Sequence, residues 1–207
     1  MQRRRPRHEE GWLLSYADLI TNLLLFFVVL LTAANISTSK LQQIAEAVSG
    51  KEQPESLSAI KEQIDKRIVE QSLQDLVRTD LTDKGLELSL NSGIVFASGE
   101  ADIAPAMEET LASMLGILAV YSSKYLFAVE GHTDERPVAT SRFPSNWELS
   151  AARAIAVRAR LEKIGVENKR IRVEGYADTI GLPEESLTGL SVEERRARHR
   201  RVIVRVY

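Results

Sequence analysis

Two groups of polar residues in this chain could do chemistry, and the first lies in an apolar stretch. Between Gly11 and Ala34, Asp18 has Ser15 one helical turn before it and Asn22 one turn after it. A carboxylate in a membrane-spanning helix costs at least about 2.5 kcal/mol to insert, so such residues usually face a protein interior and serve ion movement. We therefore expect Asp18 to accept and release a proton or another cation, supported by Ser15 and Asn22. The alternative is that Asp18 reaches water at the interface and has no such role.

The second group combines opposite charges in two polar motifs. Asp134 belongs to the run Gly131–Pro137, which follows an expected strand, and Arg153 lies in an expected helix that Asn146 opens. Together they could bind a zwitterionic ligand, because a carboxylate binds an amine and the planar guanidinium fits a carboxylate with two hydrogen bonds. Two alternatives remain: the side chains pair with each other, or Asp134 makes an Asx-turn.

The element that must carry Asp18 is a membrane-spanning helix. Roughly 20 apolar residues, at about 1.5 Å each, cross the hydrocarbon core of a bilayer. Arginines precede the stretch at positions 3, 4, 5 and 7, and the next Lys or Arg is Lys40. The positive-inside rule therefore predicts a basic cytoplasmic tail over residues 1–11, a transmembrane helix over 12–34 and all later residues outside. A cleaved signal peptide ending near Thr32–Ala34 and a buried core helix are the alternatives.

The next segment, residues 35–84, is expected to be a periplasmic linker with short helices. Apolar residues mark one face of an amphipathic helix that ends before Gly50 and Pro54; they are Leu41, Ile44, Ala45 and Val48. Residues 37–49 could be simple linker, or a helix that lies on the membrane or plugs a pore. A second helix is expected between Ile60 and Val77.

Residues 85–207 show alternating strand and helix patterns. Strands are expected at Leu86–Leu90, Ile94–Phe96, Tyr125–Glu130, Arg170–Glu174 and Val202–Tyr207, and helices at Ala106–Tyr121, Glu148–Ile164 and Val192–His199. This alternation predicts an α/β sandwich in which helices cover a sheet.

Bulk composition and spacing exclude several classes of function. The formal net charge of -2 gives no overall attraction to nucleic acid, and the absence of cysteine excludes disulfides and thiolate chemistry. His132 and Asp134 suggest a metal or hydrolytic site, but neither metal-ligand spacing nor a nucleophile–base pair accompanies them. We expect no enzyme, no bound metal and no cofactor.

The motifs support a family resemblance. The run GHTDERP…FPSNWELSAARAIAV…IGVENKRIRVEGYADT…RHRRVIVRV resembles the OmpA-like peptidoglycan-binding domain. Its FPSNWELSAARA portion resembles the version in the B subunit of flagellar stators (MotB type). The segment WLLSYADLITNLLLFFVVLL resembles the single transmembrane helix of that family, with its essential aspartate. The resemblance implies an OmpA-like sandwich with a mixed sheet, preceded by one transmembrane helix and a short helical linker.

The resemblance also implies roles for individual residues. Asp134 and Arg153 fall on the residues that hold the diaminopimelate of the wall peptide. The other matching positions are Thr133, Asn146, Leu149 and Ser150, which line or support that pocket, and Arg200 and Arg201, the closing Arg-Arg pair before the last strand. The sequence departs from the family at His199, where Asn is usual, and at Gly175–Asp178, where Gly-Tyr-Ala-Asp replaces Gly-Tyr-Gly-Glu in what we expect to be a solvent-side loop.

The implied function is that of a stator subunit in flagellar motility and chemotaxis. Two copies of the chain would sit inside a ring of five multi-spanning A-type subunits in the inner membrane, with protons or sodium ions passing through Asp18. The partner would reach the rotor, and the C-terminal domain would bind peptidoglycan in the periplasm. A related non-flagellar rotary complex in defence or envelope maintenance, and a passive peptidoglycan tether, are the alternatives.

Overall fold

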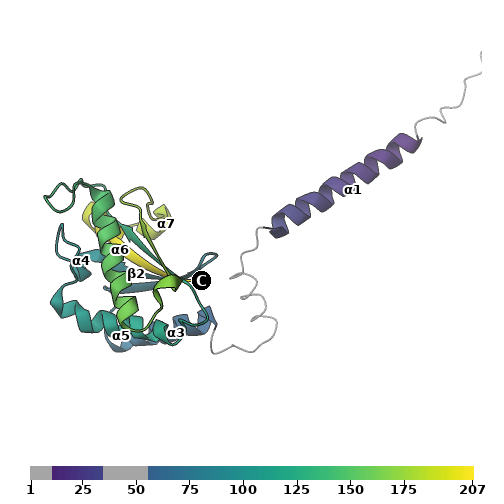
Figure 1. The fold of residues 1–207 in the computed structure, drawn as a ribbon. Helices are drawn as coiled ribbons and strands as arrows, with labels where there is room; N and C mark the ends of the chain where they lie inside the picture. Colours follow the sequence, from purple (N-terminus) through teal and green to yellow (C-terminus); the bar gives the residue numbers. More distant parts are fainter. Residues whose placement is uncertain (1–10, 35–55) are drawn as a thin grey trace, which may run out of the picture.

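The computed structural model describes residues 11–34 and 56–207, beginning with the helix α1 (Gly11–Ala34) (Figure 1). Its segment Trp12–Leu31 has a mean hydropathy of 2.1, so by length and composition it could cross a membrane. All side chains from Trp12 to Leu31 are exposed. An apolar helix is therefore present where the membrane-spanning helix was expected, whereas the basic tail and the candidate plug at 37–49 lie outside the described residues.

The rest of the described chain folds around one mixed five-stranded sheet in the order β1-β2-β5-β3-β4. The strands are β1 (Val77–Thr82), β2 (Gly85–Asn91), β3 (Phe127–His132), β4 (Ile171–Gly175) and β5 (Arg201–Val206). The helices are α3 (Leu57–Glu70), α4 (Ser92–Val95), α5 (Glu108–Ala119), α6 (Asn146–Lys163), α7 (Glu184–Leu187) and α8 (Val192–His199), with 3-10 turns at Pro105–Met107 and Asn168–Arg170. Only β3 and β4 pair in parallel, through the crossover helix α6.

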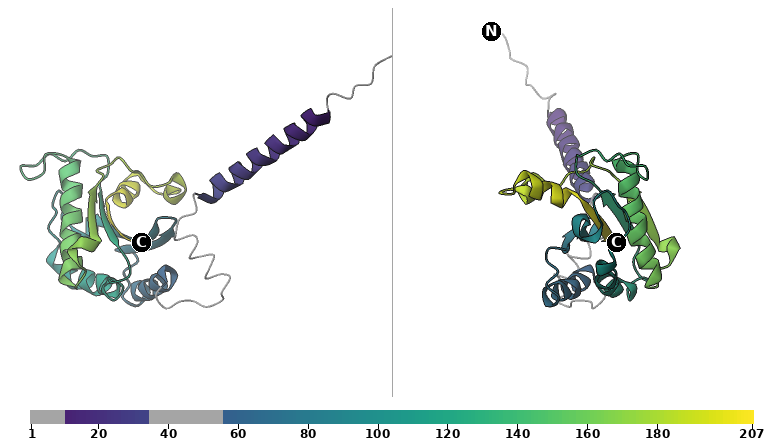
Figure 2. Two further views of the ribbon diagram at one scale, coloured as in Figure 1. Left: turned by 45° about the vertical axis from the view of Figure 1, so that its right-hand side comes forward. Right: turned by 90° about the vertical axis from the view of Figure 1, so that its left-hand side faces the viewer.

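The core lies between one face of this sheet and the helices α3, α5 and α6 (Figure 1). Alternate residues of the strands point to that face, which is why Leu86, Leu88 and Leu90 of β2 are buried there. The other face carries the polar alternate residues, and the segment with α7 and α8 lies on that side (Figure 2). The expected fold class, an α/β sandwich with a mixed sheet, is confirmed.

The folded unit begins earlier than the expected boundary at Gly85. The apolar face of α3 contributes Leu57, Ile60, Ile64 and Ile68 to the core. β1 pairs with β2 from Val77↔Leu90 to Thr82↔Gly85, so residue 85 falls inside a β-hairpin. The helix expected between Ile60 and Val77 ends at Glu70, because Val77 already belongs to β1. The domain therefore starts near Ser56, and only residues before it remain candidates for a linker.

One expected strand is a helix. Ile94 and Val95 lie in α4, which Asn91 caps by accepting a hydrogen bond from the Gly93 N–H at 3.0 Å. Extended pairing stops there because β5 begins at Arg201, directly opposite Asn91. The other expected strands and helices of residues 85–207 are confirmed within about two residues at each end, the usual uncertainty of element boundaries.

Candidate ligand site

Asp134 lies just after β3 and is already held by two contacts. Its Oδ1 accepts a hydrogen bond from the Arg136 N–H at 3.2 Å, which is an Asx-turn, and its Oδ2 forms an ion pair with an Arg200 terminal nitrogen at 2.6 Å. Its side chain is only 8% exposed. Of the two alternatives to ligand binding, the Asx-turn is therefore present. The direct pair with Arg153 is not, because Asp134 pairs with Arg200 instead.

Arg153 is buried on α6 and is held by backbone carbonyls rather than by a carboxylate. Its Nε donates to the Glu100 carbonyl at 2.8 Å and a terminal nitrogen donates to the Ala97 carbonyl at 3.4 Å. The guanidinium also lies over the Phe96 ring, 5.2 Å from its centroid. Among residues 11–34 and 56–207, no carboxylate forms an ion pair with Arg153. A buried guanidinium without a carboxylate partner can bind an incoming anion.

The charges around Arg153 make a negative ligand favourable. Burial lowers the pKa of Arg153 to about 10, the positive charge of Arg200 acts in the same direction, and Asp134 acts in the opposite one. Arg153 still carries its charge at neutral pH. Two guanidinium groups thus face one carboxylate, which leaves an excess positive charge for a ligand carboxylate to neutralise.

Asn146, the first residue of α6, fixes the loop that carries Asp134. Its side-chain nitrogen donates to the carbonyls of Asp134 at 3.3 Å and Arg136 at 3.0 Å, and its oxygen accepts from the Val138 N–H at 3.2 Å. Ser145 caps the helix by accepting from the Trp147 N–H at 3.2 Å. Asn146 is therefore a positioning residue for Asp134.

Ser150 and Thr133 connect α6 to the ends of β3 and β4. The Ser150 hydroxyl accepts from the Ala177 N–H at 3.1 Å and donates to the Trp147 carbonyl at 2.9 Å, while the Thr133 N–H donates to the Ala177 carbonyl at 2.8 Å. The buried Thr133 Oγ1 has no hydrogen-bond partner within the described part of the chain, so it can bind a ligand. Leu149 packs in a small apolar cluster with Ala101 and Phe143, so its role in the site is structural support.

The turn Gly175–Asp178 is not the solvent-side loop that we expected. Ala177 is fully buried and has a φ of 49°, in the left-handed region that favours glycine. This conformation explains why glycine is more usual there. Because both backbone groups of Ala177 bond to site elements, the turn belongs to the support of the site.

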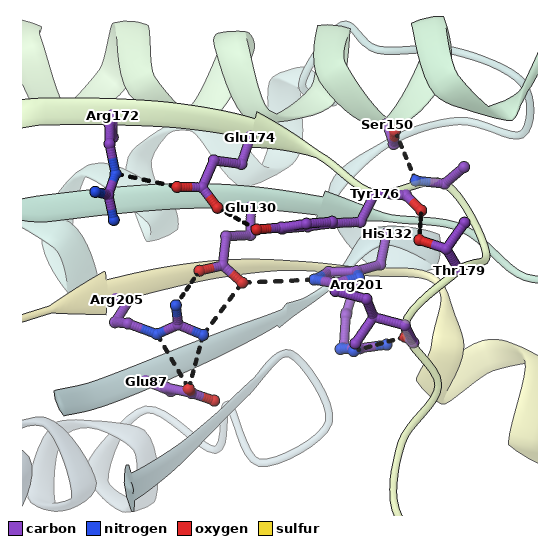
Figure 3. Close-up of polar contacts among 12 residues, drawn as sticks. Glu87, Glu130, His132, Ser150, Arg172, Glu174, Tyr176, Thr179, Arg201 and Arg205 are labelled. Atoms are coloured by element: carbon purple, nitrogen blue, oxygen red, sulfur yellow. Dashed lines mark hydrogen bonds and ion pairs between the residues drawn. The ribbon is translucent and has the colours of Figure 1, made fainter. Parts of the chain in front are cut away.

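The consecutive residues Arg200 and Arg201 point in different directions. Arg200 reaches Asp134, whereas the buried Arg201 donates to the carbonyls of His199 and Ile180, both at 3.3 Å. β5 pairs Arg201 with His132, so their side chains share the face of the sheet that is opposite the core (Figure 3). Arg200 therefore belongs to the candidate site, and Arg201 to a separate polar layer.

That polar layer was not foreseen from the sequence (Figure 3). Arg205 bonds to Glu87 at 3.0 Å and forms an ion pair with the buried Glu130 at 2.5 Å, which links β2, β5 and β3. His132 stacks on Tyr176 with ring centroids 5.4 Å apart. A hydrogen bond to Glu174, together with burial, raises the pKa of Tyr176 to about 12. The available signal for this layer was the even spacing of polar residues along two strands, Glu130 and His132 in β3 and Arg201 and Arg205 in β5.

A groove of about 950 Å³ lies between this face of the sheet and α8. Arg200 and Arg201 both line it, but Asp134 and Arg153 do not. We place the candidate site at Asp134 and Arg153, because buried opposite charges, rather than the larger open volume, indicate recognition.

In α1, the helix confirms that Ser15, Asp18 and Asn22 fall on one side, since they are three and four residues apart. The Thr21 hydroxyl donates to the Asp18 backbone carbonyl at 3.0 Å. Across residues 11–34 and 56–207 there is no cluster of three or more His, Asp or Glu that could hold a metal ion.

A model of the OmpA family matches residues 95–200, just over half of the chain. The chain belongs to the OmpA family. A second family model, described as the membrane MotB of the proton-channel complex MotA/MotB, matches residues 2–51. Both matches confirm the resemblance to a MotB-type protein, and they place the chain in a family of structural anchors rather than enzymes.

Similar proteins agree with this assignment. Motility protein B of Bacillus subtilis is 27% identical over 252 residues, covering 98% of this chain and 94% of that protein. The solved cell wall anchor of the T6SS from Pseudomonas aeruginosa is 30% identical with a TM-score of 0.60, covering 70% of this chain and 96% of that one. The periplasmic domain of Helicobacter pylori MotB (residues 78–256) is 26% identical with a TM-score of 0.54, covering 63% and 80%.

Proposed function

We propose that the chain is a stator subunit of an ion-driven rotary motor, anchored to peptidoglycan through the Asp134–Arg153 site. The observation that carries this proposal is a buried carboxylate and a buried guanidinium at one end of the sheet that do not pair with each other. The domain that holds them belongs to a chain with an apolar N-terminal helix that includes a carboxylate.

The geometry suits a wall peptide with an amine and a carboxylate on one side chain, as in diaminopimelate. Asp134 would bind the amine and Arg153 the carboxylate, with the Thr133 hydroxyl as a further hydrogen-bond donor or acceptor. Such charge-assisted bonds are roughly twice as strong as neutral ones. Asn146 and Ser150 are already committed to holding the loops, so their role is to position these groups.

Co-sedimentation of the purified full chain, in detergent, with isolated wall sacculi tests this peptidoglycan binding. We expect Asp134→Ala and Arg153→Ala each to weaken binding by about 2 kcal/mol or more, because each removes a charge-assisted contact from a buried site. Arg172→Ala is a matched control, because that arginine is 62% exposed and bonds to Glu174 at 3.0 Å, away from Asp134. Unchanged sedimentation of both site variants would refute peptidoglycan binding through Asp134 and Arg153. A fragment beginning at Gly85 would not serve, since it would lack β1 and α3.

For the membrane half, we propose that Asp18 carries the ion, with Ser15 and Asn22 beside it. One helix cannot enclose a pathway, and a polar stripe cannot face lipid at low cost, so partner helices must cover it. We propose two copies of this chain within a ring of five multi-spanning A-type subunits, which reach the rotor. The N-terminus would lie in the cytoplasm and the C-terminal domain in the periplasm, in a single-pass inner-membrane protein.

A second candidate function is a passive wall tether in another envelope machine. The likeness to the cell wall anchor of the T6SS favours it, since that protein is an anchor with the same fold. In a tether Asp18 would be dispensable and no multi-spanning partner would co-purify. A related non-flagellar rotary complex would still need Asp18 and that partner.

A further inference from the structure

Without a ligand, Asp134 is already paired with a cation. Its Oδ2 lies 2.6 Å from the Arg200 guanidinium, and its Oδ1 is used by the Arg136 N–H. Both carboxylate oxygens already have a partner, so an incoming amine competes with Arg200 for a side chain that is only 8% exposed. Binding at Asp134 is an exchange of one cation for another.

The two arginines near Asp134 differ in their freedom to move. Arg153 is buried, bonded to two carbonyls and stacked on Phe96. The Arg200 side chain is 31% exposed and follows the last residue of α8. Arg153 is thus the fixed cation of the site and Arg200 the exchangeable one.

Two further ion pairs keep the exchangeable arginine close to the site. Arg196 bonds to Glu135 at 2.7 Å, and Arg136 pairs with Glu193. Both join α8 to the loop that carries Asp134, with the charges reversed between them. When Arg200 leaves Asp134, these pairs still hold the end of α8 beside the ligand.

We propose that Arg200 is the residue that makes the site select a zwitterionic side chain and reject a simple amine. A ligand with both charges gives its amine to Asp134 and its carboxylate to Arg153 and the released Arg200 together, so every charge keeps a partner. A ligand with an amine alone leaves Arg200 unpaired and places a third positive charge around one carboxylate. This inference rests on the proposed wall-binding function and adds the basis of its selectivity.

The reason is electrostatic balance in a site with little access to water. Removing one partner of a desolvated ion pair costs far more than the pair contributes, because the remaining charge is left uncompensated. A zwitterion leaves the net charge of the site unchanged, whereas an amine raises it. Discrimination of this kind uses repulsion against the wrong ligand as well as attraction to the right one.

The test compares soluble wall peptides that differ only at the third residue: diaminopimelate, diaminopimelate with its side-chain carboxylate amidated, and lysine. For the full chain in detergent, titration calorimetry should show the first peptide binding at least about tenfold more tightly than the other two. In Arg200→Gln this preference should fall to about threefold, because the amine no longer competes with a cation while Arg153 still binds the carboxylate. Arg200→Lys, which keeps the charge without the planar fork, should retain an intermediate preference.

Arg195→Gln is the control, since Arg195 lies on α8 with 38% side-chain exposure and pairs with Glu184 instead. It should keep the wild-type preference. If Arg200→Gln binds diaminopimelate peptide and also keeps the full preference, the selective role of Arg200 is wrong while wall binding stands. If the wild-type chain binds all three peptides equally, the same conclusion holds. If it binds none of them, the wall-binding function itself fails.

Discussion

At the residue scale, His132 is a buried titratable group at the end of β3, two residues before Asp134. Burial lowers its pKa, the nearby Arg201 and Arg205 act in the same direction, and Glu130 opposes them. Its Nε2 lies 3.8 Å from a Glu130 oxygen, and neither ring nitrogen has a hydrogen-bond partner among the described residues. His132 is therefore neutral in the folded protein at neutral pH, with Tyr176 and Glu174 facing it from β4 and the turn that follows.

The sign of the pH dependence follows from this depressed pKa. The unfolded chain binds a proton at His132 more readily than the folded chain does, with an ordinary pKa of about 6.5. The contribution of neutral His132 is therefore present above that pH and is lost as the pH falls through the folded-state pKa. Glu130 adds to the effect at lower pH: burial acts to raise its pKa, but the ion pair with Arg205 helps to hold that pKa below its usual range.

We predict that His132→Phe makes folding less sensitive to acid, because phenylalanine can keep the stack on Tyr176 without a titrating nitrogen. Urea unfolding of residues 56–207 at about pH 7.5 and about pH 5.5 measures this, a range that brackets the ordinary His pKa. The wild-type fragment should lose more stability across that range than the variant. His199→Gln should behave like the wild type, since His199 lies on α8 outside the polar layer. Equal losses in the wild type and His132→Phe would contradict the prediction.

At the element scale, two glycines allow α6 to approach the sheet closely enough to build the site. Gly131 of β3 and Gly175 of β4 are direct partners in the parallel ladder. A Cβ at Gly131 would overlap the backbone carbonyl of Ser150, and one at Gly175 would lie 3.0 Å from Ala151. The first turns of α6 therefore pack directly against the backbone of β3 and β4. These turns supply Asn146, Ser150 and Arg153.

Gly131→Ala should destabilise residues 56–207 by about 3 kcal/mol, because neither backbone can move aside cheaply. Gly116→Ala is the matched control: a Cβ at this position in α5 would meet no atom within 4 Å. That change should stabilise the domain by about 0.5–1 kcal/mol through helix propensity. The midpoints of urea denaturation measure both, and a Gly131→Ala domain as stable as the wild type would show that α6 is not pressed against β3.

Residue type and spacing predicted the elements and the two charges of the site, but not how the charges are held. Asp134 could be chosen because it follows a strand, and Arg153 because it lies on the next helix. The carbonyls of Ala97 and Glu100 that hold Arg153 could not be foreseen, since any residue type supplies a backbone carbonyl. By contrast, the different directions of Arg200 and Arg201 could have been predicted, because adjacent residues that enter an extended strand point to opposite faces. The α4 helix was missed because Ile94–Phe96 is a short apolar run, which fits a strand as well as a helix.

At the scale of the whole molecule, one chain joins a carboxylate-bearing apolar helix to a domain built as an anchor. The core of the domain contains residues from 57 to 206 and none from α1, so the domain folds around its own residues. An anchor alone has no use for Asp18 within an apolar helix, and an ion pathway alone has no use for a ligand site with buried charges. We infer that the domain resists force while the membrane helix takes part in ion passage, and that the two tasks can be separated by mutation.

Swimming of the source bacterium, with Asp18→Asn introduced at the native locus, tests this account most directly. Asparagine keeps the shape of the side chain but cannot exchange a proton or pair with a sodium ion. We predict that motility is abolished while the protein remains at normal abundance and still sediments with wall sacculi. Thr21→Val is the matched control, because the Thr21 hydroxyl is bonded to the helix backbone, and it should leave motility intact. Cells that swim normally with Asp18→Asn would contradict the ion-driven role in motility.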